Sequence, residues 1–496
     1  MKPKNRVLFY YPKMMENQYP LYTPNEVLAV GSVLHSKGYK VDILDQRLIK
    51  TDVRDLGDSR DLLFIGISAK IGRQSRDGLE FAKSVNLELP EIPIIWGGWA
   101  PTRHPGEFAR HPSVDCVIAG DGEDAILQVA EALGSGRDFS RVQGAVYEDT
   151  ENDGKIIFNP PLPVMDLTRT PMLNYDLVHL DRYMDKSGRA LSYQTTRGCG
   201  GKCSFCCLND QYNHKRSIVP RERVIDELAF WIKKYDIKFI SFSDSNLFAN
   251  RNRVLKLAGE FLRRDWKIKW EGTGRADQLN NYSDEHFELL KRSGCQWIYT
   301  GLESGSQRIL DSIQKRIQLD DCTELVSRLS KADIRLWGHM ISGFPDETLT
   351  DLSKSIDLAL WTKRQNPKNK ITFNIFMPRS NDNLIKDIRI GSGRKFKDME
   401  LEEMLTVFGN ARLRMPWLSQ KMERIIKGIY FIYLQPYLDY IEAEGKMDKG
   451  NPLAVFKSFI RRRISMYRLD HKYYGFPVLY WLLRIRNRIK PSGHGW

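Results

Sequence analysis

Four of the seven cysteines in this 496-residue chain lie within nine residues, from Cys199 to Cys207. Three of them, Cys199, Cys203 and Cys206, follow the spacing C-x3-C-x2-C on a glycine-rich stretch. Three thiolates on one loop can bind three irons of a [4Fe-4S] cluster and leave the fourth iron open to another molecule. Structural zinc sites usually take four ligands in two pairs, and the chain offers no second pair. The spacing therefore favours an iron–sulfur site over zinc or chance burial, and we interpret Cys207 as structural.

The cysteines follow a predicted strand, Ser192–Thr196, which opens a long alternation of strands and helices. Six such alternations predict a partial (β/α)6 barrel over residues 191–390, with its site at the carboxyl ends of the strands. The other five strand candidates are Phe239–Ser243, Trp270–Thr273, Trp297–Gly301, Leu336–Ile341 and Ile371–Phe376.

Residues 1–140 show a separate alternation of short apolar strands and helices. It predicts an α/β fold with a doubly wound, Rossmann-like parallel sheet, in which ligands bind beyond the carboxyl ends of the strands. Two of those ends carry glycines, Gly97-Gly98 and the pair Gly120 and Gly122. These glycines either let a bulky ligand approach the backbone or simply form tight turns. The five strand candidates are Val7–Tyr11, Val41–Leu44, Leu62–Ile67, Ile92–Trp96 and Asp115–Ala119.

The remaining segments are a predicted linker over 141–190, with a hairpin near 144–157, and a basic, aromatic-rich, helical region over 391–496. The last 96 residues hold 17 Lys and Arg against 8 Asp and Glu, so +9 of the net charge of +14 lies there. The first 400 residues carry only +5, which requires no special partner. The charge surplus therefore concerns the substrate or a surface partner more than the chemistry.

Arginines combine with apolar bulk in the C-terminal region, at Arg461–Arg463 and Val478–Ile489. This pattern fits a basic helical cap over the barrel mouth, or peripheral attachment to an anionic membrane. A nucleic-acid partner is disfavoured because no RNA-binding module is visible. No apolar run reaches the roughly 18 residues that span a bilayer, and the N-terminus lacks the pattern of a signal peptide. We therefore expect a cytoplasmic protein, membrane-associated only through that region.

The cysteine triad, with Phe205 before its third cysteine, closely resembles that of the radical S-adenosylmethionine (SAM) superfamily. The resemblance implies that Cys199, Cys203 and Cys206 bind a [4Fe-4S] cluster whose open iron binds SAM. In that family the reduced cluster cleaves SAM to a 5′-deoxyadenosyl radical, which removes hydrogen from a substrate. The resemblance also implies that Phe205 packs near the adenine and that a donor such as flavodoxin or ferredoxin reduces the cluster.

Later strand ends resemble further elements of this superfamily. Asp244 stands where relatives carry an acidic residue near the substrate, and we predict it as catalytic. Glu303 and Ser304 lie in a segment that resembles the one contacting SAM, where Glu303 would accept hydrogen bonds from the amino group or ribose. The other predicted SAM-contacting residues are Arg275, Ile341 and Gly343.

Each of these residues also has a structural interpretation. Arg275 could form an ion pair with Asp277, and Glu347, after the element that resembles the adenine support, could be a charge at a helix N-terminus.

The domain ahead of the barrel resembles the cobalamin-binding domain of B12-dependent radical SAM enzymes, through Pro24–Leu28, Asp45 and the two glycine-bearing strand ends. No D-x-H-x-x-G pattern marks a histidine as lower cobalt ligand, and we interpret His104 as a loop residue. Our hypothesis is that Trp99 or its loop covers the lower face of the cobalt without binding it. The resemblance implies cobalamin contacts at Gly97, Gly98, Trp99, Gly120, Gly122 and Glu123.

The resemblance covers roughly residues 5–380 and implies a cobalamin-dependent radical SAM methyltransferase, acting on an unactivated carbon of a small or lipid-like substrate. Its rival within the class is a radical SAM enzyme that performs cyclisation, ring contraction or oxidation without methyl transfer. From other classes, an RNA-binding modification protein and a non-catalytic cofactor carrier remain, although the intact triad argues against the carrier.

Overall fold

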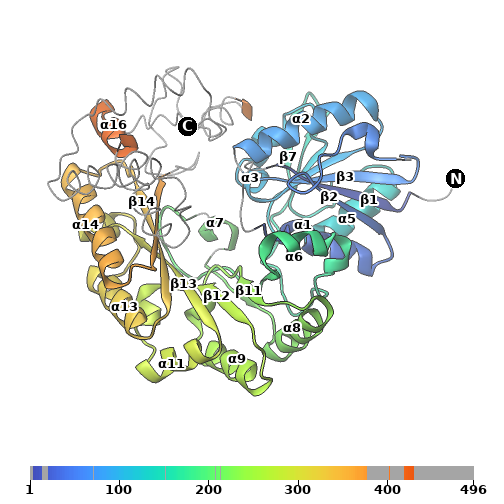
Figure 1. The fold of residues 1–496 in the computed structure, drawn as a ribbon. Coiled ribbons are helices and arrows are strands. Elements are labelled where there is room, and N and C mark those ends of the chain that lie inside the picture. The colour runs from blue at the N-terminus through green and yellow to red at the C-terminus, as the bar shows by residue number, and fades with distance from the viewer. Residues whose placement is uncertain are drawn as a thin grey trace, which may run out of the picture.

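The computed structural model describes residues 4–13, 21–57, 59–70, 72–150, 152–206, 208–212, 214–376, 401–402 and 418–428. These residues form two α/β lobes, each built on one sheet (Figure 1). The predicted α/β class, with a Rossmann-like sheet followed by a second parallel sheet, is confirmed. Cys207, the arginine-rich C-terminal stretches and most of the helical region predicted over 391–496 lie outside the described residues.

The first lobe contains a seven-stranded sheet in the order β2-β1-β3-β4-β5-β6-β7. The first five strands in this order are parallel, and β1 lies between β2 and β3, so the chain winds outward in both directions from β1. The strands are β1 (Arg6–Tyr11), β2 (Lys40–Asp45), β3 (Leu62–Ser68), β4 (Ile94–Gly97), β5 (Cys116–Ile118), β6 (Ala145–Asp149) and β7 (Lys155–Phe158).

Helices cover both faces of this sheet, so its central strands are apolar on both sides. In β1, Val7 and Phe9 pack in the cluster formed with α1 (Asn25–Ser36) and α5 (Glu123–Gly134). Leu8 and Tyr10 pack in the opposite cluster, with α2 (Arg73–Glu88), α3 (Trp99–Arg103) and α4 (Pro105–Ala109). The loops at the strand carboxyl ends are thereby held between two buried layers.

The hairpin β6–β7 belongs to this sheet, although the sequence pattern placed it in a linker. Val117 in β5 pairs with Val146 in β6, antiparallel, and both residues are buried. The hairpin thus covers the backbone edge that β5 would otherwise expose. The remainder of the predicted linker includes η2 (Tyr175–Leu177) and α6 (Leu180–Ser187).

The second lobe contains six parallel strands in chain order, as a partial barrel requires. The strands are β8 (Ala190–Tyr193), β11 (Phe239–Phe242), β12 (Lys269–Thr273), β13 (Cys295–Glu303), β14 (Arg335–Ser342) and β15 (Lys370–Ile375). Helices form the outer layer (Figure 1): α8 (Arg221–Tyr235), α9 (Arg251–Arg263), α11 (Asp284–Arg292), α13 (Leu319–Lys331) and α14 (Leu349–Gln365). The shorter elements are η1 (Val53–Asp55), α7 (Leu208–Tyr212), η3 (Leu247–Ala249), α10 (Ala276–Leu279), α12 (Gln307–Ser312) and α16 (Gln420–Gly428).

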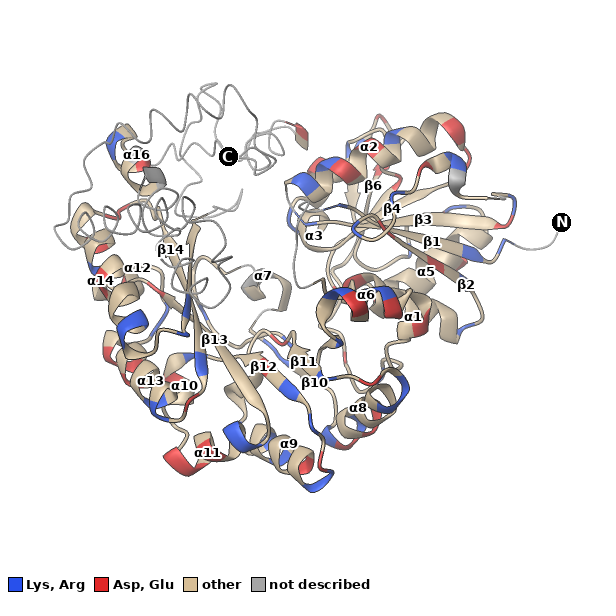
Figure 2. Ribbon diagram, viewed as in Figure 1, with Lys and Arg blue, Asp and Glu red and all other residues tan. Residues whose placement is uncertain are grey.

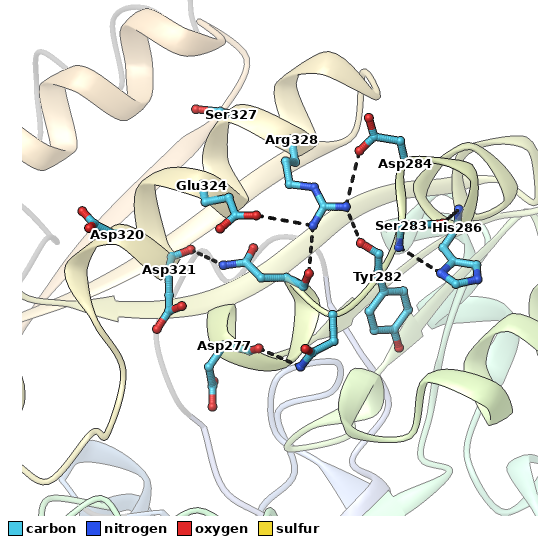
Figure 3. Close-up of polar contacts among 12 residues, drawn as sticks. Asp277, Tyr282, Ser283, Asp284, His286, Asp320, Asp321, Glu324, Ser327 and Arg328 are labelled. Carbon is cyan, nitrogen blue, oxygen red and sulfur yellow. Dashed lines mark hydrogen bonds and ion pairs between the residues drawn. The ribbon is translucent and has the colours of Figure 1, made fainter.

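The outer layer is fastened by polar contacts such as those of Arg328 in α13 (Figure 3). Its guanidinium donates to the backbone oxygens of Asn280 and Tyr282 and forms ion pairs with Asp284 and Glu324. These contacts join α13 to the segment between β12 and α11.

Figure 2 shows Lys, Arg, Asp and Glu residues on many of the outer helices of both lobes. None of the described helices combines the length and apolar content that crossing a bilayer requires.

The predicted strand Ser192–Thr196 is divided in the structure. β8 ends at Tyr193, and Thr196–Arg197 forms a separate short strand, β9, that pairs antiparallel with β10 (Ser217–Ile218). The chain therefore leaves the barrel sheet two residues before β9. From this smaller pair of strands it enters the loop that carries Cys199, Cys203 and Cys206, called the cysteine loop below.

Candidate cofactor site between the two lobes

Asp244 fixes the loop that leads from β8 to the cysteines. Its carboxylate accepts hydrogen bonds from the Thr195 amide at 2.6 Å, the Thr195 hydroxyl at 2.5 Å and the Thr196 amide at 2.9 Å. The side chain is fully enclosed, and burial raises the pKa of this carboxyl although these hydrogen bonds oppose the rise. The carboxylate predicted as catalytic is thus bound to the backbone that carries the cysteine loop.

Two of the cysteine sulfurs face nitrogen donors from neighbouring strand ends. Asn246 Nδ2, after β11, lies 3.7 Å from Cys199 Sγ, and Arg275 Nη1, after β12, lies 3.5 Å from Cys203 Sγ. A Cβ at Gly201 would lie 3.5 Å and 3.9 Å from these two sulfurs, so both border the same small space. N–H donors stabilise negative charge on sulfur. This surrounding suits thiolate ligands of an iron–sulfur cluster.

Within the part of the chain that the structure describes, no three His, Cys, Asp or Glu side chains converge as a single ion would require. In a cluster, each cysteine binds a different iron, so its sulfurs need not meet at one point.

Arg275 forms the structural ion pair that its sequence suggested and also contacts the cysteine loop, while its contact with SAM stays a prediction. It forms an ion pair with Asp277 at 3.1 Å, contacts Cys203, and donates to the backbone oxygen of Lys315 at 2.8 Å. Burial opposes its charge, but Asp277 and the Cys203 sulfur raise the pKa of the guanidinium overall. Arg275 therefore connects the cysteine loop to the chain beyond α12.

Glu303, at the end of β13, forms a buried ion pair with Lys315. The distance from Lys315 Nζ to Glu303 Oε1 is 2.7 Å, and the two side chains are 8% and 7% exposed. Burial alone would lower the pKa of Lys315, but Glu303 and the Cys203 sulfur raise it overall. A Cβ at Gly301 would lie 1.9 Å from Glu303 Oε1 and 2.8 Å from Lys315 Nζ, so a larger residue there would displace this pair. Nothing in the local sequence singles out Lys315, which the sequence analysis missed.

Ser304, by contrast, faces the protein interior. Its hydroxyl lies 3.1 Å from that of Ser355 in α14 and accepts a hydrogen bond from the Ser306 amide at 3.1 Å. Ser304 is fully buried, so in this conformation the side chain fastens the end of β13 to α14.

Phe205, in the cysteine loop, lies near Ile341 and Gly343 at the end of β14. The Phe205 ring meets the Phe344 ring edge to face at 6.1 Å, and Ile341 packs in the same apolar cluster. The Gly343 amide donates to the Glu347 carboxylate, and burial raises the pKa of Glu347 to about 7. The structure thus brings Phe205, Ile341 and Gly343 to one place, while their contact with adenine stays a prediction.

A cavity of about 750 Å³ lies between the strand ends of the first lobe and the start of the barrel. From the barrel side, Ser192, Gln194, Arg197 and Ser243 line it. From the first lobe, its lining includes all six residues predicted to contact cobalamin: Gly97, Gly98, Trp99, Gly120, Gly122 and Glu123. A space of this size that exposes backbone at several glycines fits a bulky ligand.

Gly98 shows why glycine is needed in this wall. Its φ is +89°, and a Cβ there would lie 2.6 Å from the Ser68 hydroxyl oxygen. The chain can therefore turn tightly from β4 into α3 and present Trp99 to the cavity.

The cavity lining contains no histidine among the described residues. His104 lies buried between α3 and α4, and burial lowers its pKa to about 4. Asp45, also singled out from the sequence, pairs with Arg47 at 2.6 Å, and Arg47 lines the cavity.

Comparison with known proteins agrees with this geometry. Residues 15–130 match the B12 binding domain, and residues 193–359 match the radical SAM superfamily. The chain is 28% identical over 321 residues to an uncharacterised methyltransferase of Pyrococcus horikoshii. The matched region covers 64% of this chain and 68% of that protein. It is 25% identical over 372 residues to the anaerobic magnesium-protoporphyrin IX monomethyl ester cyclase of Rubrivivax gelatinosus, covering 71% and 65%.

Among solved structures, the cobalamin-dependent S-adenosylmethionine radical enzyme OxsB with aqua-cobalamin bound is similar in fold. The two structures superpose with a TM-score of 0.73 at 17% sequence identity. The superposition covers 99% of this chain and 76% of the OxsB chain. The barrel with its cysteine loop is therefore a radical SAM domain. With both domains, the chain belongs to the cobalamin-dependent radical SAM enzymes, which confirms the predicted family and its use of SAM and cobalamin.

Proposed function

We propose that this protein is a methyltransferase that methylates an unactivated carbon of a small or lipid-like substrate. The observation that carries the proposal is the cavity shared by the two lobes, with the predicted cobalamin contacts on one wall and the approach to the cysteine loop on the other. Relatives include a protein named as a methyltransferase.

Three cysteines, Cys199, Cys203 and Cys206, would hold the cluster, and the residues lining the cavity would hold cobalamin. When bound, the cluster with SAM supplies a radical that removes hydrogen, and cobalamin supplies a methyl group. The chain's own part is orientation. Asp244 holds the entry to the cysteine loop, and Arg275 and Asn246 donate to its sulfurs. The Glu303–Lys315 pair fixes the position of a carboxylate at the end of β13.

The lower face of cobalamin would meet the loop after β4, where Trp99 lines the cavity. We propose that Trp99 covers this face without binding cobalt. An EPR spectrum of cob(II)alamin bound to the protein should therefore lack nitrogen superhyperfine splitting, and such splitting would contradict the proposal. Trp99→Ala should weaken hydroxocobalamin binding, measured by absorbance titration.

The proposed activity is tested by reconstituting the protein anaerobically with iron, sulfide and hydroxocobalamin and counting the products of SAM. Methylation of an unactivated carbon consumes two SAM and yields S-adenosylhomocysteine and 5′-deoxyadenosine together. A cyclisation, as the name of the Rubrivivax relative describes for that protein, would yield no S-adenosylhomocysteine. Failure to bind hydroxocobalamin would contradict the cofactor assignment itself.

We also propose that the basic C-terminal region attaches the protein to anionic membranes and that a flavodoxin or ferredoxin supplies electrons. The charge of +9 in the last 96 residues supports membrane contact. In a flotation assay with anionic liposomes, deletion of residues 460–496 should abolish co-flotation, and unchanged flotation would contradict membrane contact. Reduction of the cluster by a purified flavodoxin, followed by EPR, tests the electron donor.

We further propose that the first domain extends through β7 to about residue 158, and that the predicted boundaries of 190 and 390 delimit the barrel domain. Pairing of β6 with β5 supports the first boundary. Limited proteolysis should then cut between residues 159 and 174 before it cuts near residue 140. The opposite order would support the predicted domain boundary at residue 140 instead.

A further inference from the structure

Arg197 is a mostly buried cation at the boundary of the two lobes. It stands two residues before Cys199, in the short strand β9. Its Nη2 lies 2.5 Å from Glu123 Oε1, and its Nη1 lies 3.5 Å from Asp121 Oδ1. The side chains of Arg197, Asp121 and Glu123 are 12%, 7% and 3% exposed. Both carboxylates belong to the first lobe, at the turn from β5 into α5.

Asp121 also holds the other end of the cysteine loop. Its Oδ1 accepts hydrogen bonds from Gln211 Nε2 and from the Tyr212 hydroxyl, each at 3.2 Å. These residues end α7, which follows Cys206 and lies between the two lobes (Figure 1). One turn of the first lobe therefore grips the chain both before and after the three cysteines.

The same turn forms part of the cavity wall. Gly120 to Glu123 line the cavity, and so do Arg197, Gln211 and Tyr212. A ligand that fills the cavity would therefore contact both the turn and the residues that the turn holds. Charges that are buried together interact more strongly than exposed ones, so small displacements of this turn act directly on Arg197.

We propose that Arg197, Asp121 and Glu123 are positioning residues that couple the two cofactor sites: cobalamin in the cavity tightens the hold of the cysteine loop on its cluster, and the cluster tightens cobalamin binding by the same factor. The second half follows because coupling between two binding equilibria is reciprocal. The inference rests on the proposed function only in assigning the cavity to cobalamin. It adds that the ion pairs of Arg197 with Asp121 and Glu123 make binding at one site depend on whether the other site is filled.

The test is the rate of cluster loss to an iron chelator, followed by absorbance under anaerobic conditions. Full-length protein is reconstituted with iron and sulfide and divided into samples with and without saturating hydroxocobalamin. In the wild type, hydroxocobalamin should slow cluster loss at least about fivefold, the lower end of typical coupling between sites. In Arg197→Gln, the two rates should agree within about twofold, and Arg197→Lys should recover part of the difference.

Arg328→Gln provides the matched control. Arg328 is also a partly buried arginine held by carboxylates and backbone oxygens, but its contacts lie in the outer layer of the barrel (Figure 3). This variant should keep the wild-type ratio of the two rates, even if the protein is less stable. If Arg197→Gln takes up no iron–sulfur cluster, Glu123→Gln tests the same ion pair from the other lobe. In this variant too, hydroxocobalamin should no longer slow the loss of the iron–sulfur cluster.

Three results would overturn the inference: the first two leave the proposed function intact, and the third removes the cobalamin assignment on which both rest. The wild type could bind hydroxocobalamin without slowing cluster loss. Alternatively, Arg197→Gln and Glu123→Gln could both retain the full ratio, which would make the ion cluster merely structural. Finally, if the wild type binds no hydroxocobalamin in an absorbance titration, the assignment of the cavity fails first and the coupling fails with it.

Discussion

Lys315 Nζ lies 2.7 Å from Glu303 Oε1 in a pocket closed to solvent, beside a glycine that leaves room for the carboxylate. Glu303 itself has a φ of 58°, an uncommon backbone conformation for a residue other than glycine. The pairing between β13 and β14 also shifts register between Gly301 and Glu303. A strained strand end and a buried cation thus act together to set the direction of one carboxylate.

The first prediction concerns that cation. Lys315→Met removes the partner of Glu303 and leaves a buried carboxylate uncompensated, which should destabilise the fold by about 3–5 kcal/mol. The loss is measured as a shift in the urea midpoint of the cofactor-free protein. Glu303→Gln retains an oxygen that can accept from Lys315 but removes the opposite charge, so it tests whether charge or shape dominates. Equal midpoints for the wild type and Lys315→Met would contradict the prediction.

The second prediction concerns the donor to Cys203. Arg275→Gln removes a positive charge and an N–H donor from the cluster ligand, so the cluster should become harder to reduce. A hydrogen bond worth about 1 kcal/mol corresponds to roughly 40 mV in a one-electron couple, and the potential should fall by at least that amount. Potentiometry followed by EPR measures the fall. Asn246→Leu removes an uncharged donor from Cys199 and should give a smaller fall, whereas an unchanged potential in both variants would show that these donors do not reach the sulfurs.

The third prediction concerns Asp244. Asp244→Ala leaves two backbone amides and a hydroxyl at Thr195 and Thr196 without their acceptor, so the cysteine loop should lose its fixed entry. Iron bound per chain after reconstitution should fall to less than half of the wild-type value. Asp244→Asn keeps one acceptor oxygen and should bind an intermediate amount. If Asp244 acted only on the substrate, both variants would bind iron fully and lose turnover alone.

The fourth prediction is a pH dependence that originates at Glu347. Burial raises its pKa from 4.5 to about 7 in the folded protein, and its Oε1 accepts no hydrogen bond from the described residues. Because the folded form binds the proton more tightly, stability contributed by this group is present below about pH 4.5 and is lost as the pH rises through 7. The loss amounts to roughly 3 kcal/mol.

Glu347→Gln cannot ionise, so its stability should change less between pH 5 and pH 8 than that of the wild type. Guanidinium midpoints at the two pH values measure the difference. Identical pH dependence in both proteins would show that Glu347 titrates at its ordinary pKa when folded.

Much of the fold and part of the site follow from local sequence patterns. The strand candidates coincide with the observed strands to within a few residues, because apolar runs broken by glycine and polar residues are a local property. Gly98, Trp99 and Glu123 could be placed near one another because parallel strands end at a common edge.

Contacts between distant segments could not be predicted in this way. Lys315 reaches Glu303 through a turn after α12, and Arg197 reaches Glu123 across two lobes, so neither contact leaves a local pattern. The division of the first barrel strand has the same origin, since the carboxylate that holds Thr195 and Thr196 comes from Asp244, about 50 residues later.

The grip of the β5–α5 turn on both ends of the cysteine loop has a consequence for how this architecture can change. Asp121 and Glu123 help to fix the spacing between the two lobes by meeting Arg197, together with contacts such as those from Asn25 to Ser192 and from Tyr22 to Glu271. A single substitution at Arg197 should therefore loosen the cysteine loop from the first lobe while leaving the sheets of both lobes intact.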